Sequence, residues 1–112
     1  MTRAMNIRVL AIALLALSLP AAAASGDAEA GKKKSTPCAV CHGANGVSVS
    51  PDFPNLAGQY EDYLYKALTH YANGKRKNPI MAMQVQQLHL SEKDMRDLAA
   101  YFSHQQALVV KH

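Results

Sequence analysis

Apolar and polar positions along the chain follow helical spacing in three places, and no segment alternates like a β-strand. The clearest apolar stripe lies in residues 60–71, and an Asn-Gly pair at 73–74 follows as a stop signal. Residues 27–34 form a shorter segment with acidic residues first and lysines last, which suits a helix dipole. A third helix over 91–102 opens with Ser-Glu-Lys-Asp, a capping-box-like start. The pattern predicts an all-α domain with three main helices.

Two long segments separate these helices, residues 43–58 and 74–90, and both are rich in Gly, Pro, Asn and Ser. Loops of this length in a small helical domain either surround something or are disordered. The chain contains no Trp and only two Phe. Because the helices supply few large apolar side chains, we expect an additional apolar group in the core.

The start of the chain has the pattern of an export signal. Arg3 and Arg8 form a positive region, an apolar run follows over residues 9–19, and small residues lead up to Ala24. The run is shorter than the roughly 20 residues that a membrane-spanning helix needs, so removal is expected rather than retention as an anchor. We predict a secretory signal peptide over residues 1–24, cleaved near Ala24, and a periplasmic protein.

The rest of the chain predicts one domain over residues 25–106 and a flexible C-terminal tail over 107–112. The formal net charge of +4 falls to +2 when the two arginines of the signal are removed. This balance does not indicate nucleic-acid binding. Basic runs at 32–34 and 75–77 are either solvated helix ends or sites that steer an acidic partner.

The chain's two cysteines, Cys38 and Cys41, stand in the sequence Cys-Ala-Val-Cys-His, which ends at His42. A structural zinc site needs further ligands, and the other four histidines form no second pair. A thioredoxin-like disulfide follows a strand, whereas a helix and a proline precede this pair. Covalent haem attachment uses both thiols and the adjacent histidine. We predict one covalent haem c, which also supplies the missing apolar mass.

The second ligand of a haem iron would come from a methionine in the segment 74–90. Met95 belongs to the apolar face of the last helix, which leaves Met81 and Met83. If residues 81–88 form a helical turn, Met81 shares its face with Gln84, Val85 and Leu88, whereas Met83 shares its face with Gln86, Gln87 and Leu90. A haem pocket is apolar, so we favour Met81, with Met83 as the rival. In the third alternative both pack against the ring without binding iron.

Several stretches resemble the class I c-type cytochromes, in particular the bacterial type seen in each half of the di-haem periplasmic cytochromes and in their single-haem relatives. The matching stretches are CAVCHGANG, FPNLAGQY, YLYKAL, GKRKNPIM and LSEKDMRDLAAYF. Together they span most of residues 38–102. The resemblance implies a small cytochrome c fold, with helices and long loops wrapped around one covalent haem.

The resemblance also implies roles for single residues. Thioether bonds would form at the two cysteines, His42 would be the proximal ligand, and a distal sulfur would come from the stretch 78–81. The carbonyl of Pro54 would accept a hydrogen bond from the far nitrogen of that histidine. Gly31 and Tyr101 would mark a close crossing of the first and last helices. The spacing from Met81 to Leu90-Ser91, where the last helix starts, is about two residues longer than is usual in the family. Counting back from Leu90-Ser91 by the usual spacing would therefore favour Met83 as the ligand.

These observations predict a non-enzymatic carrier of single electrons. Its partners would be redox proteins, acidic or membrane-bound, and neither a nucleic acid nor a small-molecule substrate is expected. We expect a monomer. Two alternatives stay open: a haem-based ligand binder or sensor, and a cytochrome subunit of a larger oxidoreductase complex.

Overall fold

The computed structural model describes residues 13, 15–18 and 25–107, and most of the predicted signal peptide and the end of the predicted tail lie outside these ranges. Within the described residues there are five helices and no strand, so the all-α prediction is confirmed. The helices are α1 (Ala28–Lys34), α2 (Thr36–His42), α3 (Glu61–Asn73), α4 (Pro79–Gln87) and α5 (Glu92–Ser103).

The long helix α3 matches the predicted apolar stripe, with one difference at its start. It ends at Asn73 because Gly74 adopts a left-handed conformation, with φ of 80°, that residues with side chains rarely take. Leu64 is buried in the core, as the stripe requires. Tyr60, which the stripe placed on the same face, is 82% exposed. It precedes the first helical turn as the N-cap, so the helical periodicity does not apply to it.

Helices α1 and α5 cross closely at Gly31, as the resemblance implied. A Cβ atom at Gly31 would overlap the carbonyl oxygen of Asp97 and would lie 2.8 Å from the Cβ of Tyr101. Only glycine leaves room for two backbones at this distance. The crossing fixes the N-terminal helix on the last helix, and therefore sets where the chain continues toward the cysteines.

The core is centred on α5, whose start is held by a full capping box. Ser91 Oγ accepts from the backbone N–H of Asp94 at 3.1 Å, and the Asp94 carboxylate accepts from the N–H of Ser91 at 3.0 Å. Met95 is buried on this helix, as predicted. The buried cluster between α3 and α5 consists of Leu64, Leu98, Ala99, Tyr101 and Phe102.

The structure adds two short helices, α2 and α4, to the three main helices that the pattern predicts. The apolar pattern assigned no element to residues 35–42, but α2 begins at Thr36 and carries both cysteines. Proline fits the first turn of a helix, where its missing N–H has no partner to lose. The same holds at Pro79, which opens α4 inside the segment 74–90. The helical turn considered for 81–88 is therefore real and starts earlier.

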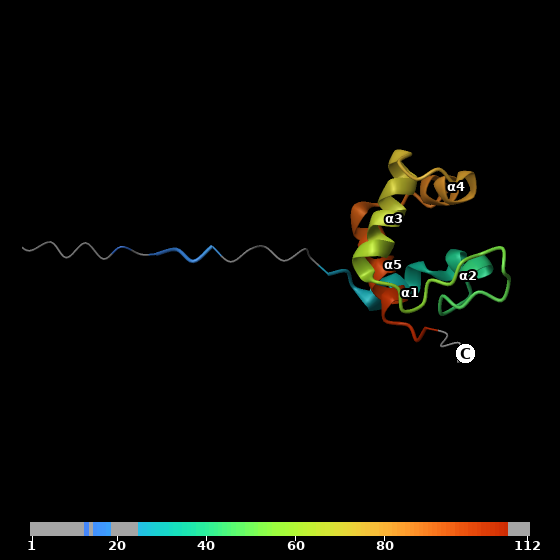
Figure 1. Cartoon of the computed structure of the whole chain (residues 1–112), viewed down its shortest axis with the longest axis horizontal. Helices are drawn as coiled ribbons and strands as arrows, with labels where there is room; N and C mark the ends of the chain where they lie inside the picture. Colours follow the sequence, from blue (N-terminus) through green and yellow to red (C-terminus); the bar gives the residue numbers. More distant parts are fainter. Residues whose placement is uncertain (1–12, 14, 19–24, 108–112) are drawn as a thin grey trace, which may run out of the picture.

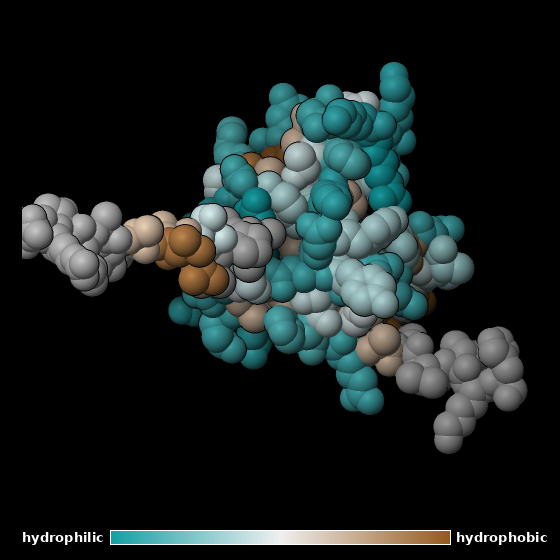
Figure 2. Space-filling model, turned by 60° about the vertical axis from the view of Figure 1, so that its left-hand side comes forward, coloured by the Kyte–Doolittle hydropathy of each residue, from teal (hydrophilic) through white to brown (hydrophobic). Residues whose placement is uncertain are grey.

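The arrangement of the helices leaves two of them on one side of the fold. Helix α5 packs against both α1 and α3, whereas among the described helices the backbone of α2 comes close only to α1, and that of α4 only to α3. Figure 1 shows α2 and α4 projecting toward the same side of the α3–α5 stack. The face seen in Figure 2 is covered mainly by hydrophilic side chains. Among the described residues, no helix is long and apolar enough to cross a membrane.

A buried carboxylate, Asp97, joins α1 to α5. Its Oδ1 accepts from the N–H of Asp27 at 2.9 Å, and its Oδ2 accepts from the ammonium groups of Lys34 and Lys93 at 2.7 and 2.6 Å. Burial alone would raise the pKa of Asp97, but these three donors together hold it well below its ordinary value of 3.8. The ionised form is therefore the one that stabilises the fold.

Replacing this carboxylate in the variant Asp97→Asn is expected to lower the free energy of unfolding by about 2 kcal/mol at neutral pH. Because the pKa of Asp97 is lowered on folding, its contribution is complete above the unfolded value and is lost as the pH falls below it. Urea unfolding at pH 7 and pH 3 should show a smaller difference between variant and parent at pH 3. Asp62→Asn is the matched control, because Asp62 pairs with Lys66 at an exposed site. Equal losses in both variants would contradict the prediction.

Candidate functional site

A cavity of about 240 Å³ lies between α2 and α4, with a mostly apolar wall. Four helices and the segment before α3 line it, which explains why α2 and α4 make no contact with each other. The apolar stripe of α3 faces this cavity through Tyr63, Leu64, Ala67, Leu68 and Tyr71. The apolar stripe of α3 thus forms one wall of a ligand-sized space. Leu88, the C-cap residue of α4, also lines the cavity.

His42 is the last residue of α2 and lines the cavity, and one of its ring nitrogens forms a hydrogen bond. It is buried, and its Nδ1 lies 2.9 Å from the carbonyl oxygen of Pro54. A carbonyl oxygen only accepts, so Nδ1 carries the hydrogen and the neutral ring keeps its lone pair on Nε2. The Phe53 ring also packs against the imidazole in an edge-to-face arrangement, with centroids 6.3 Å apart. The bond to Pro54 expected from the resemblance is present, and it prepares Nε2 as a metal ligand.

The loop that supplies Pro54 is held in place by its own contacts. Gly46 accepts at its carbonyl from the N–H groups of Leu56 and Ala57, at 2.7 and 3.0 Å. The Tyr101 hydroxyl donates to the carbonyl of Ala44 at 2.8 Å, which ties the start of the loop to α5. A segment without secondary structure is therefore fixed well enough to orient the histidine.

Cys38 and Cys41 lie one turn apart on α2, and neither forms a disulfide. Cys38 lines the cavity and packs against the core cluster, and burial raises the pKa of its thiol. Cys41 is half-buried and lies outside the cavity wall itself. The i, i+3 spacing nevertheless places both thiols beside His42 on one short helix.

Met81 and Met83 occupy different positions on α4. Met81 lines the cavity together with Gln84, Val85 and Leu88, the face expected for it, whereas Met83 is 46% exposed and lies outside the wall. The backbone of Met81 is held at the start of the helix, because its N–H donates to Asn78 Oδ1 at 3.0 Å. The helix register therefore brings Met81, and not its rival, to the cavity that also contains His42.

One residue of the cavity wall was not anticipated from the sequence. Arg76 was part of a basic run assigned to solvent or to a partner, yet it lines the cavity beside Tyr63 and Tyr71. Its backbone N–H donates to the carbonyl of His70 at 3.0 Å, which turns the chain back along α3 after Gly74. Nothing in the local sequence distinguishes Arg76 from the lysines on either side of it.

The chemistry of the donor set fits a haem c group. Two unpaired thiols lie next to an imidazole whose tautomer leaves Nε2 for iron, and a thioether sulfur lines the same apolar space. The cavity separates α2 from α4, where a flat apolar group would contact both. This combination suits a protein that binds haem through its own thiols and carries electrons on it.

Comparison with known proteins identifies the family. The cytochrome c family model matches residues 28–106, so the chain belongs to the cytochrome c family of electron-transfer proteins. The single Cys-x-x-Cys-His motif defines one covalently bound haem c. Electron transfer by such a protein makes and breaks no substrate bond.

Three relatives illustrate the relationship. The chain is 44% identical to cytochrome c4 of Pseudomonas aeruginosa over 103 residues, which cover 91% of this chain and 50% of that protein. It is 40% identical to cytochrome c-554(548) of Halomonas halodenitrificans over 83 residues, which cover 73% of this chain and all of that protein. The crystal structure of reduced cytochrome c4 from Pseudomonas stutzeri superposes with a TM-score of 0.71 at 42% identity, over 76% of this chain and 48% of that one. The chain thus spans about half the length of its cytochrome c4 relatives.

Proposed function

We propose that this protein is a periplasmic carrier of single electrons, with its haem iron bound by His42 and Met81 and its haem attached through Cys38 and Cys41. The observation that carries the proposal is the presence of His42 and Met81 in the walls of one apolar cavity. When bound, the haem supplies an iron that changes between ferric and ferrous states. The residues that hold the haem keep its surroundings nearly unchanged when the charge of the iron changes.

The geometry supports electron transfer over ligand binding. The Pro54 carbonyl and the Phe53 ring hold the imidazole, and the Asn78 cap holds the Met81 backbone, so both ligands are positioned before any change of charge. A haem-based sensor or ligand binder needs a distal iron position that is open or occupied by a displaceable ligand. In this proposal the sulfur of Met81 fills that position. The apolar wall excludes water and favours the less charged ferrous form.

The contacts of Ser25 support the proposed cleavage near Ala24. Ser25 Oγ donates to the two carboxylate oxygens of Glu61 at 3.0 and 3.1 Å, and the N–H of Gly26 donates to Glu61 at 2.8 Å. In the apolar run before it, the described side chains of Leu15 and Leu17 are 84% and 83% exposed. Removal of residues 1–24 would therefore not take away any buried contact of these two leucines with the domain. Intact mass and N-terminal sequencing of the exported protein should give Ser25 as the first residue, and recovery in the membrane fraction would contradict cleavage.

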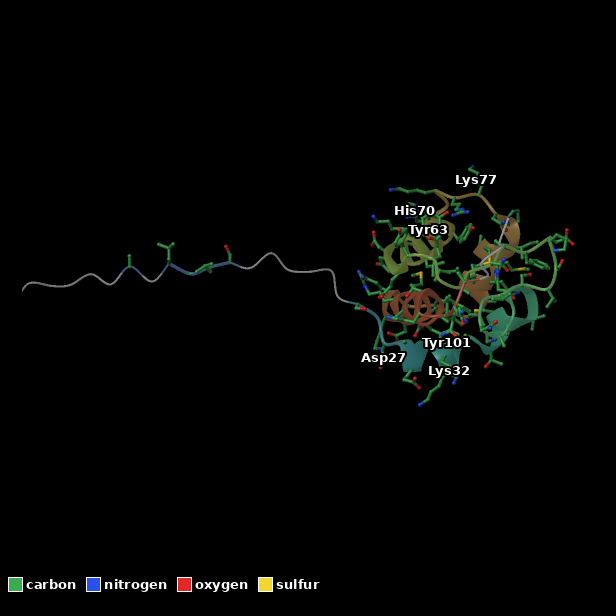
Figure 3. The ribbon with its side chains drawn as sticks, turned by 60° about the horizontal axis from the view of Figure 1, so that its bottom comes forward. Asp27, Lys32, Tyr63, His70, Lys77 and Tyr101 are labelled. Atoms are coloured by element: carbon green, nitrogen blue, oxygen red, sulfur yellow. The ribbon has the colours of Figure 1, made fainter. Side chains whose placement is uncertain are left out.

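The partner is proposed to be an acidic redox protein that approaches the basic run at 75–77. Lys75 and Lys77 are exposed and flank Arg76 in the cavity wall. In Figure 3, Lys77 and Tyr63 lie toward one end of the molecule, and Asp27 and Lys32 toward the other. Positive charge near the cofactor raises the encounter rate with a negative partner more than it raises affinity.

Neutralising these lysines in Lys75→Gln/Lys77→Gln is expected to slow oxidation of the ferrous protein by ferricyanide several-fold at low ionic strength, to about the level reached at high salt. Lys32→Gln/Lys33→Gln removes the same charge from α1 and serves as the control, with a smaller effect. Stopped-flow rates across a salt series test this. Rates of the first variant that equal those of the parent protein at every salt concentration would contradict a steering role.

The proposed function as a whole is tested by spectra of the purified exported protein in both redox states. Methionine sulfur on ferric iron gives a charge-transfer band, and a filled distal position prevents carbon monoxide from binding readily to the ferrous form. Ready binding of carbon monoxide would instead favour the ligand-binder alternative. Purification as a small monomer would support a diffusing carrier, and co-purification with a membrane complex would support a subunit role.

A further inference from the structure

The carboxylate of Glu61, the first residue of α3, binds the segment of chain that leads into α1. Its two oxygens accept from Ser25 Oγ at 3.0 and 3.1 Å, and Oε1 also accepts from the N–H of Gly26 at 2.8 Å. The side chain is half-buried, and among the residues that the structure describes no lysine, arginine or histidine forms an ion pair with it. Glu61 thus has neutral hydrogen-bond donors but no cation to balance its charge.

The residues that follow Ser25 fix its position at the start of α3. Gly26 lies against the backbone of α5, because a Cβ atom there would overlap the carbonyl oxygen of Arg96. The N–H of Asp27 donates to Asp97 Oδ1 at 2.9 Å, which ties the next residue to α5 as well. Figure 1 shows the chain entering the fold beside the first turns of α3. The backbone of Ser25 is therefore held close to the Glu61 carboxylate.

Removal of residues 1–24 would change the charge at this point of the fold. Hydrolysis adds water across the Ala24–Ser25 peptide bond, which leaves a carboxyl group on Ala24 and an amino group on Ser25. An α-amino group has an ordinary pKa of about 8, so it is mostly protonated at neutral pH. This nitrogen is joined to the Ser25 Oγ through only Cα and Cβ, and the Oγ already contacts Glu61. The new ammonium group therefore lies within reach of the carboxylate, where the uncleaved chain has a neutral amide.

We propose that Glu61 is the binding site for the amino terminus that export creates, and that the ion pair of the Ser25 ammonium with Glu61 ties the processed chain to α3. The inference rests on the cleavage after Ala24 proposed above and is independent of the iron ligands. Helix α3 forms one wall of the cavity, and Glu61 is its first residue. Processing thus fastens this wall to the α1–α5 pair, and the processed protein is more stable than a form with residues before Ser25.

The experiment compares two forms of the exported holoprotein, one that starts at Ser25 and one with a short glycine extension before it, each confirmed by intact mass. The extension keeps the hydrogen bonds of Ser25 and Gly26 but moves the ammonium away from Glu61. In urea unfolding at pH 7, we expect the unfolding equilibrium constant of the Ser25 form to be about fivefold smaller. In Glu61→Gln the extension should have no effect, which a double-mutant cycle measures directly. Asp62→Asn is the matched control and should keep the full difference, because Asp62 pairs with Lys66 instead.

Equal stability of the two forms with Glu61 present would overturn the inference, as would the same difference between them in Glu61→Gln. If Glu61→Gln does not yield folded holoprotein, acetylation of the α-amino group carries the test. It should be several-fold slower at Ser25 than at the glycine extension, and equal rates would overturn the inference. N-terminal sequencing of the natural protein distinguishes the two proposals. A first residue other than Ser25 counts against the proposed cleavage, whereas a Ser25 start without coupling to Glu61 counts against the binding site alone.

Discussion

Replacing both cysteines in Cys38→Ala/Cys41→Ala is expected to abolish covalent haem attachment completely. Each thiol adds across a vinyl double bond of haem, its sulfur bonding one carbon and its hydrogen going to the other, and the chain has no other cysteine to substitute. On a denaturing gel stained for haem, the parent protein should keep its colour at the protein band and the double variant should show none. Intact mass should fall by the mass of one haem and of the two sulfur atoms that the substitutions remove.

The single variants Cys38→Ala and Cys41→Ala test the contribution of each thiol to haem attachment. Each keeps one thiol on α2 and should retain a haem held by one thioether bond, in lower yield. Cys38 lines the cavity and Cys41 lies beside it, so loss of Cys38 should reduce the yield more. Haem that stays with the double variant through denaturation would show that the attachment site is misassigned.

The structural consequence of losing haem is also expected to be large. Among the described helices, the backbones of α2 and α4 each come close to a single other helix, and the cavity between them has mostly apolar walls. Without the haem these walls are exposed to water, at about 25 cal/mol for each Å² of apolar surface. Thermal unfolding followed by circular dichroism should therefore begin far lower in the double variant, with the region of α4 losing protection from hydrogen exchange before the α1–α5 pair.

Removing the sulfur in Met81→Ala is expected to abolish the methionine charge-transfer band of the ferric protein and to lower the reduction potential strongly. Methionine opposite histidine raises the potential of a haem iron, so its loss favours the ferric state. The opened position should also let carbon monoxide bind the ferrous form. Absorption spectroscopy and redox titration of the same preparation measure all three effects.

Met83→Ala is the matched control, two residues away on the same helix. Because Met83 is half-exposed and lies outside the cavity, its variant should keep the band and the potential of the parent protein. Loss of the band in Met83→Ala and its retention in Met81→Ala would reverse the assignment. Loss in both would indicate that α4 must keep its packing on α3 for either sulfur to bind.

Much of the fold was predictable because its signals are local. The stripe of α3, the left-handed stop at Gly74 and the capping box at Ser91 each depend on residues within one or two turns. The short helices α2 and α4 were harder to predict. Each has a proline in its first turn. Because a proline can end one helix or fit the first turn of another, the local sequence does not distinguish the two roles.

The sequence by itself determined the chemistry, because two thiols and an imidazole stand close together in the chain, and its export-like start predicts a secretory context. It left Met81 and Met83 as rivals, because spacing from the preceding Asn-Pro and from the following Leu-Ser gave opposite answers. Only the tertiary structure decided which sulfur lines the cavity with His42, since that depends on how α4 is rotated against α3. The same physical reason applies to Arg76. It resembles its lysine neighbours in sequence, but in the folded chain it lines the cavity and they do not.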